Sequence, residues 1–289
     1  MNTDWQLRTA DGVDCFEYSP DPRLVLAFFT RRGGVSRGPY ESLNTSFAVG
    51  DEDRNVEENL TRIRHALQLP AIQTMKQTHS DTVLTIAGGP VLAETLIGDA
   101  CITGQAGMGL GLKVADCLPV YVYAENSSCI GIAHCGWRGT AAKLAEKTAR
   151  EMSRHFSVPL SSLRFALGPC ICPNCYEVGA DVRSEFSREF ANADAFFTRS
   201  ETPKAQTSQN RDGTAERPDP ALDPLSPRSL DPFPKYRLDL RAANRWLLMK
   251  LGLLETRSIA LCTYEDGRLF YSARRDQVTG RNLAVIALR

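Results

Sequence analysis

Two neighbouring stretches decide how this chain folds: VADCLPVYVY at residues 114–123 and CIGIAHCGWRGT at residues 129–140. The first is rich in valine and tyrosine and the second in isoleucine, which are residue types enriched in β-strands. A polar turn at residues 125–128 separates them. The pattern therefore predicts two adjacent strands, with Cys117 near an end of the first strand and His134 near an end of the second.

A turn and a helix are expected directly after the second strand. Gly136 and Gly139 indicate the turn, and Thr140 stands where an N-cap is expected. Apolar and small side chains then recur at helical spacing, at Leu144, Thr148, Met152 and Phe156. Because the first amides of a helix are unpaired, the sequence predicts an anion site at this junction, facing the histidine.

The rest of the chain mixes strands and helices without a strict βαβ order and without an internal repeat. Strands are predicted at residues 23–30, 75–86, 163–169, 259–263, 269–272 and 282–288, and helices at 54–69, 176–186 and 236–252. We therefore predict the α/β class in its mixed α+β form. The expected architecture is a single compact domain over residues 1–289, with mixed, partly antiparallel sheets flanked by helices.

One segment departs from this pattern. Residues 198–235 hold seven of the sixteen prolines and few large apolar side chains. Such a segment cannot bury enough apolar surface to offset its ordering entropy. We interpret it as a flexible insertion in the domain.

Composition excludes several classes of partner and location. Lysine plus arginine and aspartate plus glutamate both number 34, so nothing favours binding to nucleic acid or to an acidic membrane. No apolar run has the length of a membrane span, and the N-terminus lacks the pattern of a signal peptide. The nine cysteines are an odd number in a large chain, which is typical of reduced thiols, and we expect a cytoplasmic protein.

Two histidines and one cysteine are candidates for a metal site. His79, Cys117 and His134 would leave one tetrahedral position open, which for zinc is a catalytic pattern that acidifies a bound water. Taken alone, His79 is better interpreted as a hydrogen-bonded turn residue than as a ligand. The chain has only four histidines, too few for the trinuclear cluster of a multicopper oxidase, so copper would need a smaller site.

A second cysteine group has the spacing C-x-C-x-x-C at Cys170, Cys172 and Cys175. A zinc ribbon or an iron–sulfur site would need a fourth ligand, and the sequence places none nearby. Free thiols are the favoured interpretation.

Charged residues around the motif have alternative roles. Asp116 is either a group supporting Cys117 or acid–base chemistry, or a cap or salt-bridge partner. Arg138 and the pair Arg274–Arg275 are either clamps for phosphate or carboxylate, or members of surface ion pairs.

Six motifs together resemble the YfiH-type laccase-domain family, which includes relatives described as peptidoglycan editing factors. The resemblance covers nearly the whole chain apart from the insertion. The motifs are KQTH at 76–79, GDACIT at 98–103, ADCLP at 115–119, AHCGWRG at 133–139, GPCI at 168–171 with YEVG at 176–179, and RR at 274–275 with GR at 280–281.

This resemblance implies a function as well as a fold. The family was once labelled polyphenol oxidase and is now described as purine nucleoside phosphorylases with adenosine deaminase activity. Membership implies that adenosine, inosine, guanosine and methylthioadenosine are substrates, with phosphate as co-substrate. From the sequence as a whole, we expect a monomer or weak homodimer that binds neither nucleic acid nor membrane.

The resemblance further assigns roles to individual residues. It implies that His79, Cys117 and His134 converge as the catalytic and metal-binding group, usually with zinc and alternatively with copper. We add a set of expected substrate-binding or phosphate-binding residues: Gln77, Arg138 and Arg274. Cys135 departs from the family pattern, which commonly has alanine or another small residue there, and the insertion is unusually long.

Three other functions remain open. One is a metal-free amidase that edits peptidoglycan precursors, with Cys117 as nucleophile and His134 or His79 as base. The second is a copper-dependent phenol oxidase, against which the shortage of histidines argues. The third is a non-enzymatic redox or partner-binding module that uses the cysteines.

Overall fold

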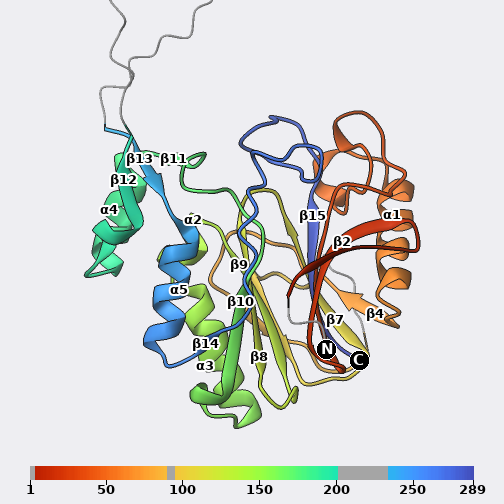
Figure 1. The fold of residues 1–289 in the computed structure, drawn as a ribbon, viewed down its shortest axis with the longest axis horizontal. Helices are drawn as coiled ribbons and strands as arrows, with labels where there is room; N and C mark the ends of the chain where they lie inside the picture. The colour runs from red at the N-terminus through yellow and green to blue at the C-terminus, as the bar shows by residue number, and fades with distance from the viewer. Residues whose placement is uncertain (1–3, 90–94, 201–233) are drawn as a thin grey trace, which may run out of the picture.

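Two six-stranded sheets form the centre of the protein (Figure 1). They are seen in a computed structural model that describes residues 4–89, 95–200 and 234–289. The first sheet has the order β1 (Gln6–Ala10), β2 (Val13–Asp21), β3 (Leu24–Phe29), β15 (Asn282–Leu288), β7 (Met108–Val114) and β4 (Ala71–Gln73). The second has the order β14 (Leu254–Glu255), β10 (Leu163–Leu167), β8 (Leu118–Ala124), β9 (Ile130–Cys135), β6 (Ala100–Thr103) and β5 (Val83–Thr85).

Helices cover the outer faces of both sheets. The helix α1 (Asp53–Ala66) lies against the first sheet, and α3 (Leu144–Phe156) with α5 (Leu240–Lys250) against the second (Figure 1). Two shorter helices, α2 (Trp137–Ala141) and α4 (Ala180–Glu189), complete the second side. A small sheet combines β11 (Glu177–Val178), β13 (Tyr236–Leu238) and β12 (Phe197–Arg199), and the 3₁₀ turns are Gly38–Tyr40, Phe47–Val49, Leu160–Ser162 and Ala193–Phe196.

Strand β3 shows why the central strands are apolar on both faces. Leu24, Leu26 and Phe28 belong to the cluster between the two sheets, whereas the alternate residues belong to the cluster under α1. Successive side chains of a strand point to opposite faces, so a strand covered on both sides has no polar face. Because the sheets share the central layer, we infer that the chain forms one domain.

The two strands predicted from the opening motif are adjacent. Strands β8 and β9 pair antiparallel, with Leu118 opposite Cys135 and Pro119 opposite His134. This register brings Cys117 and His134 together at the same end of these two central strands. The mixed α+β prediction is confirmed by these mixed sheets.

Several predicted boundaries are wrong. The helix after the motif is two helices, separated by Lys143 at a positive φ of 59°. Gly136, not Thr140, precedes the first of them. The helix predicted at 236–252 begins only at Leu240, with Asp239 as its cap, because residues 236–238 pair in a sheet. Likewise, the helix predicted at 176–186 starts at Ala180.

Three predicted strands are also shorter or absent. Of residues 75–86, only Val83–Thr85 form a strand. Residues 259–263 and 269–272 lie outside the named strands, although Cys262 forms an isolated bridge with Cys170. In the first segment, three backbone N–H groups donate to the carboxylate of Asp99 instead of to a neighbouring strand. In the other two, the N–H groups donate to the carbonyls of Leu167, Cys170 and Asp266.

The proline-rich insertion lies mostly outside the described residues, at 201–233. Its ends are structured, since Arg199 pairs with Tyr236 and Thr198 with Arg237. In the part of the chain that the structure describes, no helix has the length and apolarity needed to cross a membrane.

Candidate metal centre

His79, Cys117 and His134 converge at one point. One ligand atom from each lies within 4.8 Å of the other two, and the two imidazole rings are 5.0 Å apart at their centroids. His134 is buried, Cys117 is half-buried and His79 is exposed. The group therefore has a closed side in the protein interior and an open side toward solvent.

Close packing at a glycine fixes the position of the thiol. Leu118 of β8 pairs with Cys135 of β9. Cys117 precedes Leu118 and Gly136 follows Cys135, so Cys117 and Gly136 lie beside each other. A Cβ atom on Gly136 would lie 2.7 Å from the Cys117 sulfur and 3.8 Å from His79 Nδ1. Only a residue without a side chain leaves room for the sulfur here.

Asp99 organises both histidines. Its carboxylate accepts hydrogen bonds from His134 Nδ1 at 2.9 Å and from the backbone N–H of His79 at 3.1 Å. It also accepts bonds from the N–H of Thr78 and from both the N–H and the hydroxyl of Ser80. These bonds hold the turn at 78–80, where His79 has a φ of 60°, and they leave His134 Nε2 as the ring nitrogen for a ligand.

The pKa values of the site follow from this arrangement. Burial would lower the pKa of His134, but the nearby Cys117 sulfur and Asp99 outweigh it and raise that pKa to about 9. Burial and the neighbouring His134 lower the pKa of His79. Burial would raise the pKa of Asp99, yet its bonds to His134 and Ser80 hold it well below its usual range. Asp99 is therefore an anion that holds Nδ1–H of His134.

The donor set suits a zinc ion. Two imidazole nitrogens and a thiolate are its preferred ligands, and a histidine whose second nitrogen donates to a carboxylate is the usual supporting arrangement. Three protein ligands leave the fourth position open, and the open side faces a cavity of about 620 Å³. The ligand set thus fits a catalytic metal and not a closed structural one.

The cavity is cationic at its wall. Lys76, Lys113 and Arg281 line it together with the three candidate ligands, and the 3₁₀ turn at Phe47–Val49 forms another side. Arg281 is half-buried, with Nη1 donating to the carbonyls of Thr279 and Gly280 at 3.0 Å. Burial lowers the pKa of Arg281 despite nearby acidic groups, so an anion bound in the cavity would compensate a desolvated cation.

The other predicted ligands have different environments. Gln77 lines the cavity, but its amide exchanges two hydrogen bonds with the backbone of Lys113, at 2.8 and 2.9 Å. Arg138 is exposed and stacks on Trp137, beside a separate depression. Arg274 is exposed, lies over the ring of Tyr176 and donates to the carbonyl of Glu177. Neither arginine lines the described cavity.

The predicted anion site at Thr140 is wrong. Thr140 is buried inside α2, and its hydroxyl accepts a hydrogen bond from Asn244 at 2.9 Å. The helix that begins at Gly136 is only five residues long. The charged groups that line the cavity are the side chains of Lys76, Lys113 and Arg281.

Asp116 makes three hydrogen bonds that support the segments around Cys117. Its carboxylate accepts hydrogen bonds from the hydroxyls of Thr263 and Ser272 and from the N–H of Arg274. Asp116 directly precedes Cys117, so these bonds hold two C-terminal segments beside that cysteine. Sequence reasoning missed the roles of Asp99 and Arg281, although both occur in the quoted motifs.

The predicted lack of a fourth ligand near the second cysteine group is also wrong. Cys172 and Cys175 lie beside Cys262 and Glu265, which come from the C-terminal part of the chain. Cys170 is separate and buried, with its thiol directed to the carbonyl of Ile171.

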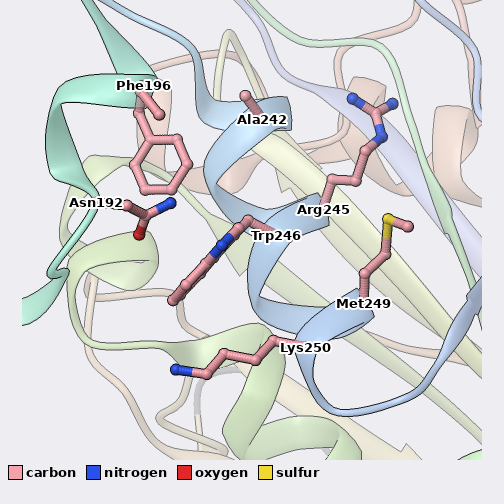
Figure 2. Close-up of a pocket in the computed structure, with 8 residues that line it drawn as sticks. Asn192, Phe196, Ala242, Arg245, Trp246, Met249 and Lys250 are labelled. Atoms are coloured by element: carbon pink, nitrogen blue, oxygen red, sulfur yellow. The ribbon is translucent and has the colours of Figure 1, made fainter.

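A further pocket of about 430 Å³ lies beside α5, away from the histidines (Figure 2). Phe196, Trp246 and Met249 give it an apolar wall, and its lining holds no histidine, cysteine or carboxylate. The candidate chemistry therefore belongs to the cavity at His79, Cys117 and His134.

Comparison with known proteins identifies the family. The model of the family described as multi-copper polyphenol oxidoreductase laccase matches residues 25–289. The chain belongs to this family. The resemblance to the YfiH-type laccase-domain proteins is thereby confirmed. The family description implies several coppers, yet this member has four histidines, of which only two reach the centre.

Relatives with assigned names include two purine nucleoside phosphorylases. YfiH of Escherichia coli (strain K12) is 32% identical over 271 residues, covering 93% of this chain and 96% of that protein. YlmD of Geobacillus stearothermophilus is 31% identical over 285 residues, covering 93% and 92%. Among solved structures, Bacillus licheniformis YfiH, titled a hypothetical protein, has a TM-score of 0.78 at 27% identity and covers 95% of this chain and 96% of its own.

Replacing Gly136 by alanine should disable the centre while leaving the fold intact. The backbone at Gly136, with φ of −67°, accepts alanine, so the added methyl displaces the nearby Cys117 sulfur. We expect any activity that depends on this centre to fall about 10²-fold. Gly89→Ala is the matched control, because nothing lies within 4 Å of a Cβ there. Equal activity of the two variants, at similar melting temperatures, would contradict the assigned position of the sulfur.

Proposed function

We propose that this protein is a zinc-dependent purine nucleoside phosphorylase with adenosine deaminase activity. Its proposed substrates are adenosine, inosine, guanosine and methylthioadenosine, with phosphate as co-substrate. The observation that carries the proposal is one cavity that combines the three candidate ligands His79, Cys117 and His134 with a cationic wall. Relatives named purine nucleoside phosphorylase, 31–32% identical over most of the chain, support it.

The residues of the cavity suit the requirements of these reactions. Phosphorolysis needs a phosphate held near the ribose C1′ and a proton for the departing purine. Arg281, Lys76 and Lys113 supply positive charge on the wall, and His79 is the exposed imidazole within the ligand group. When bound, zinc would acidify a water for attack on C6 of adenine. Asp99 holds His134 in the orientation in which Nε2 faces the ligand group.

Product analysis tests the proposal. Purified protein is incubated with adenosine, with and without phosphate, and the bases and nucleosides are separated by chromatography. We expect phosphate-dependent adenine together with phosphate-independent inosine. Absence of both products from zinc-loaded protein would refute the proposed function.

Arg281 should govern the response to phosphate. Arg281→Met keeps the aliphatic stem but removes a charge-assisted contact, so KM for phosphate should rise about 10- to 100-fold. Deamination, which uses no phosphate, should change much less. Arg138→Met serves as the control, since Arg138 lies outside the cavity. A larger rise in KM for phosphate in the control would indicate that Arg138, and not Arg281, binds the phosphate.

Metal binding should depend on pH. In the metal-free protein the pKa of His134 is about 9, so its imidazole is protonated at neutral pH. A metal must displace that proton, and the apparent affinity for zinc should rise about tenfold per pH unit up to about pH 9. Competition with a chromophoric chelator at pH 6.5, 7.5 and 8.5 measures this dependence. A constant affinity over this range would show that metal binding displaces no proton from His134.

One observation favours a second function, the metal-free amidase. Cys117, His134 and Asp99 are arranged as a nucleophile, a base and a group that orients the base. In that case the chelated, zinc-free protein would keep full activity toward an amide of a peptidoglycan precursor. Loss of all turnover on chelation, with recovery on adding zinc, distinguishes the phosphorylase.

The thiols support a cytoplasmic location. All nine cysteines are free, and a chain that must keep thiols reduced fits a reducing compartment. We propose that the protein acts there on soluble nucleosides, as a monomer or weak homodimer.

A further inference from the structure

Four potential ligands outside the cavity form a second group. Cys172, Cys175, Cys262 and Glu265 each offer an atom, and these atoms all lie within 4.8 Å of one another. The contacts are direct: Glu265 Oε1 lies 3.5 Å from Cys172 Sγ and 3.4 Å from Cys175 Sγ. The metal, phosphate and nucleoside chemistry proposed above uses none of the four.

The four ligands come as two pairs with the same spacing. Cys172 and Cys175 are separated by two residues, as are Cys262 and Glu265. Cysteine pairs spaced in this way on facing turns are the usual construction of a structural zinc site, and a glutamate oxygen is also a zinc ligand. In a tetrahedral site with Zn–S bonds of about 2.3 Å, neighbouring sulfurs are about 3.8 Å apart. Four atoms already within 4.8 Å need little contraction to reach that geometry.

The backbone supports both turns before any metal binds. The N–H of Cys175 donates to the carbonyl of Cys172 at 3.0 Å, and the N–H of Asp266 donates to the carbonyl of Cys262 at 3.3 Å. The N–H of Cys172 donates to the sulfur of Cys262 at 3.3 Å, which joins the two turns. The group is thus organised from both sides.

Positive charge lies behind the second turn. Arg275 donates through Nη1 to the carbonyls of Thr263 at 3.0 Å and Tyr264 at 2.9 Å, the two residues between Cys262 and Glu265. Arg241 donates to the carbonyl of Leu261 at 2.7 Å. Three thiolates and a carboxylate around a divalent cation carry net negative charge, which Arg241 offsets in part. Arg275 is also paired with Asp276, at 2.8 Å.

We propose that Cys172, Cys175, Cys262 and Glu265 bind a structural zinc ion that joins the loop after β10 to the turn at residues 262–265. All four tetrahedral positions are filled by protein, so this ion performs no chemistry on substrate. The ion would stabilise the segments that contact Asp116, the residue before Cys117. Ile171, next to the first pair, donates its N–H to the carbonyl of Asp116, and Thr263 donates its hydroxyl to the Asp116 carboxylate.

Metal stoichiometry tests this site separately from the catalytic one. The full-length chain is purified without chelator, and zinc per chain is measured by atomic spectroscopy after loading with zinc sulfate and desalting. We expect about two equivalents in the wild type and about one in Cys172→Ser/Cys175→Ser. Cys129→Ala and Asp266→Asn are the controls, a buried cysteine outside both groups and the acid next to Glu265, and both should keep the wild-type content.

A second variant keeps the test decisive if the serine variant does not fold. His79→Ala/His134→Ala removes the catalytic ligands and leaves the four proposed ligands intact. This variant should retain about one zinc, and cobalt substituted for that zinc should show thiolate-to-cobalt absorption with tetrahedral d–d bands. No metal in this variant, unchanged zinc in the serine variant, or a Cys172–Cys175 disulfide whose reduction restores no zinc uptake would each overturn the site.

Discussion

Replacing Cys117 by alanine is expected to abolish phosphorolysis and deamination together. Its sulfur is the only thiol within the ligand group at the cavity, and both proposed reactions depend on that group. Two imidazoles alone leave an incomplete zinc site, so we expect kcat/KM for both reactions to fall on the order of 10³-fold or more. Assays of adenine and inosine release from adenosine measure both effects in one sample.

A neighbouring cysteine provides the control for this experiment. Cys135 is buried next to His134, but its side chain belongs to the cluster packed against the outer helices. Cys135→Ala should therefore keep both activities within about threefold of the wild type, since only a small core contact is lost. Retention of either activity by Cys117→Ala at the wild-type rate would refute the three-ligand site. Loss of one reaction alone would show that the two reactions use different groups.

Asp99→Asn should have the second-largest effect, although Asp99 does not line the cavity. The amide keeps the size of the side chain but loses the charge that holds His134 Nδ1–H. An asparagine also presents an NH₂ group, which cannot accept from the N–H groups that the carboxylate now satisfies. We expect zinc affinity at the cavity to fall about 10- to 100-fold.

The same substitution should also lower stability. Asp99 is fully buried, and leaving one or two of its backbone partners unsatisfied costs about 1–3 kcal/mol. Urea unfolding of the metal-free protein isolates this cost from the loss of metal. The control is Asp81→Asn, since Asp81 is an exposed residue of the same loop that pairs with Lys147. Equal zinc affinity in Asp99→Asn and Asp81→Asn would show that Asp99 does not orient the ligands.

Regular strands were the features most readily predicted from the sequence. The β8–β9 hairpin, β3 and β15 are largely apolar, and their apolar runs were predicted within about two residues. The irregular segments were not. Residues 75–86 are predicted as a strand, but three N–H groups of this segment donate to the carboxylate of Asp99, about twenty residues away in the chain. Local propensity carries no information about such a partner.

Charged residues show the same limit at the site. Arg138 was a reasonable choice because it follows His134 by four residues, yet α2 carries its side chain onto Trp137 and away from the cavity. Arg281 lies far along the chain from Cys117 and reaches the cavity because β15 pairs with both β3 and β7. Glu265 and Cys262 reach Cys172 and Cys175 through a comparable long-range contact.

By itself, the sequence determined the mixed class of the fold, the hairpin that carries Cys117 and His134, and the family to which the chain belongs. These depend on local periodicity and on contiguous motifs, which are readable along the chain. Tertiary structure alone decided which cations face the cavity, which carboxylate orients the histidines and which residues complete the second cysteine group. Those pairings arise because folding brings distant segments within hydrogen-bonding distance. The order of the strands in the two sheets decides which segments meet.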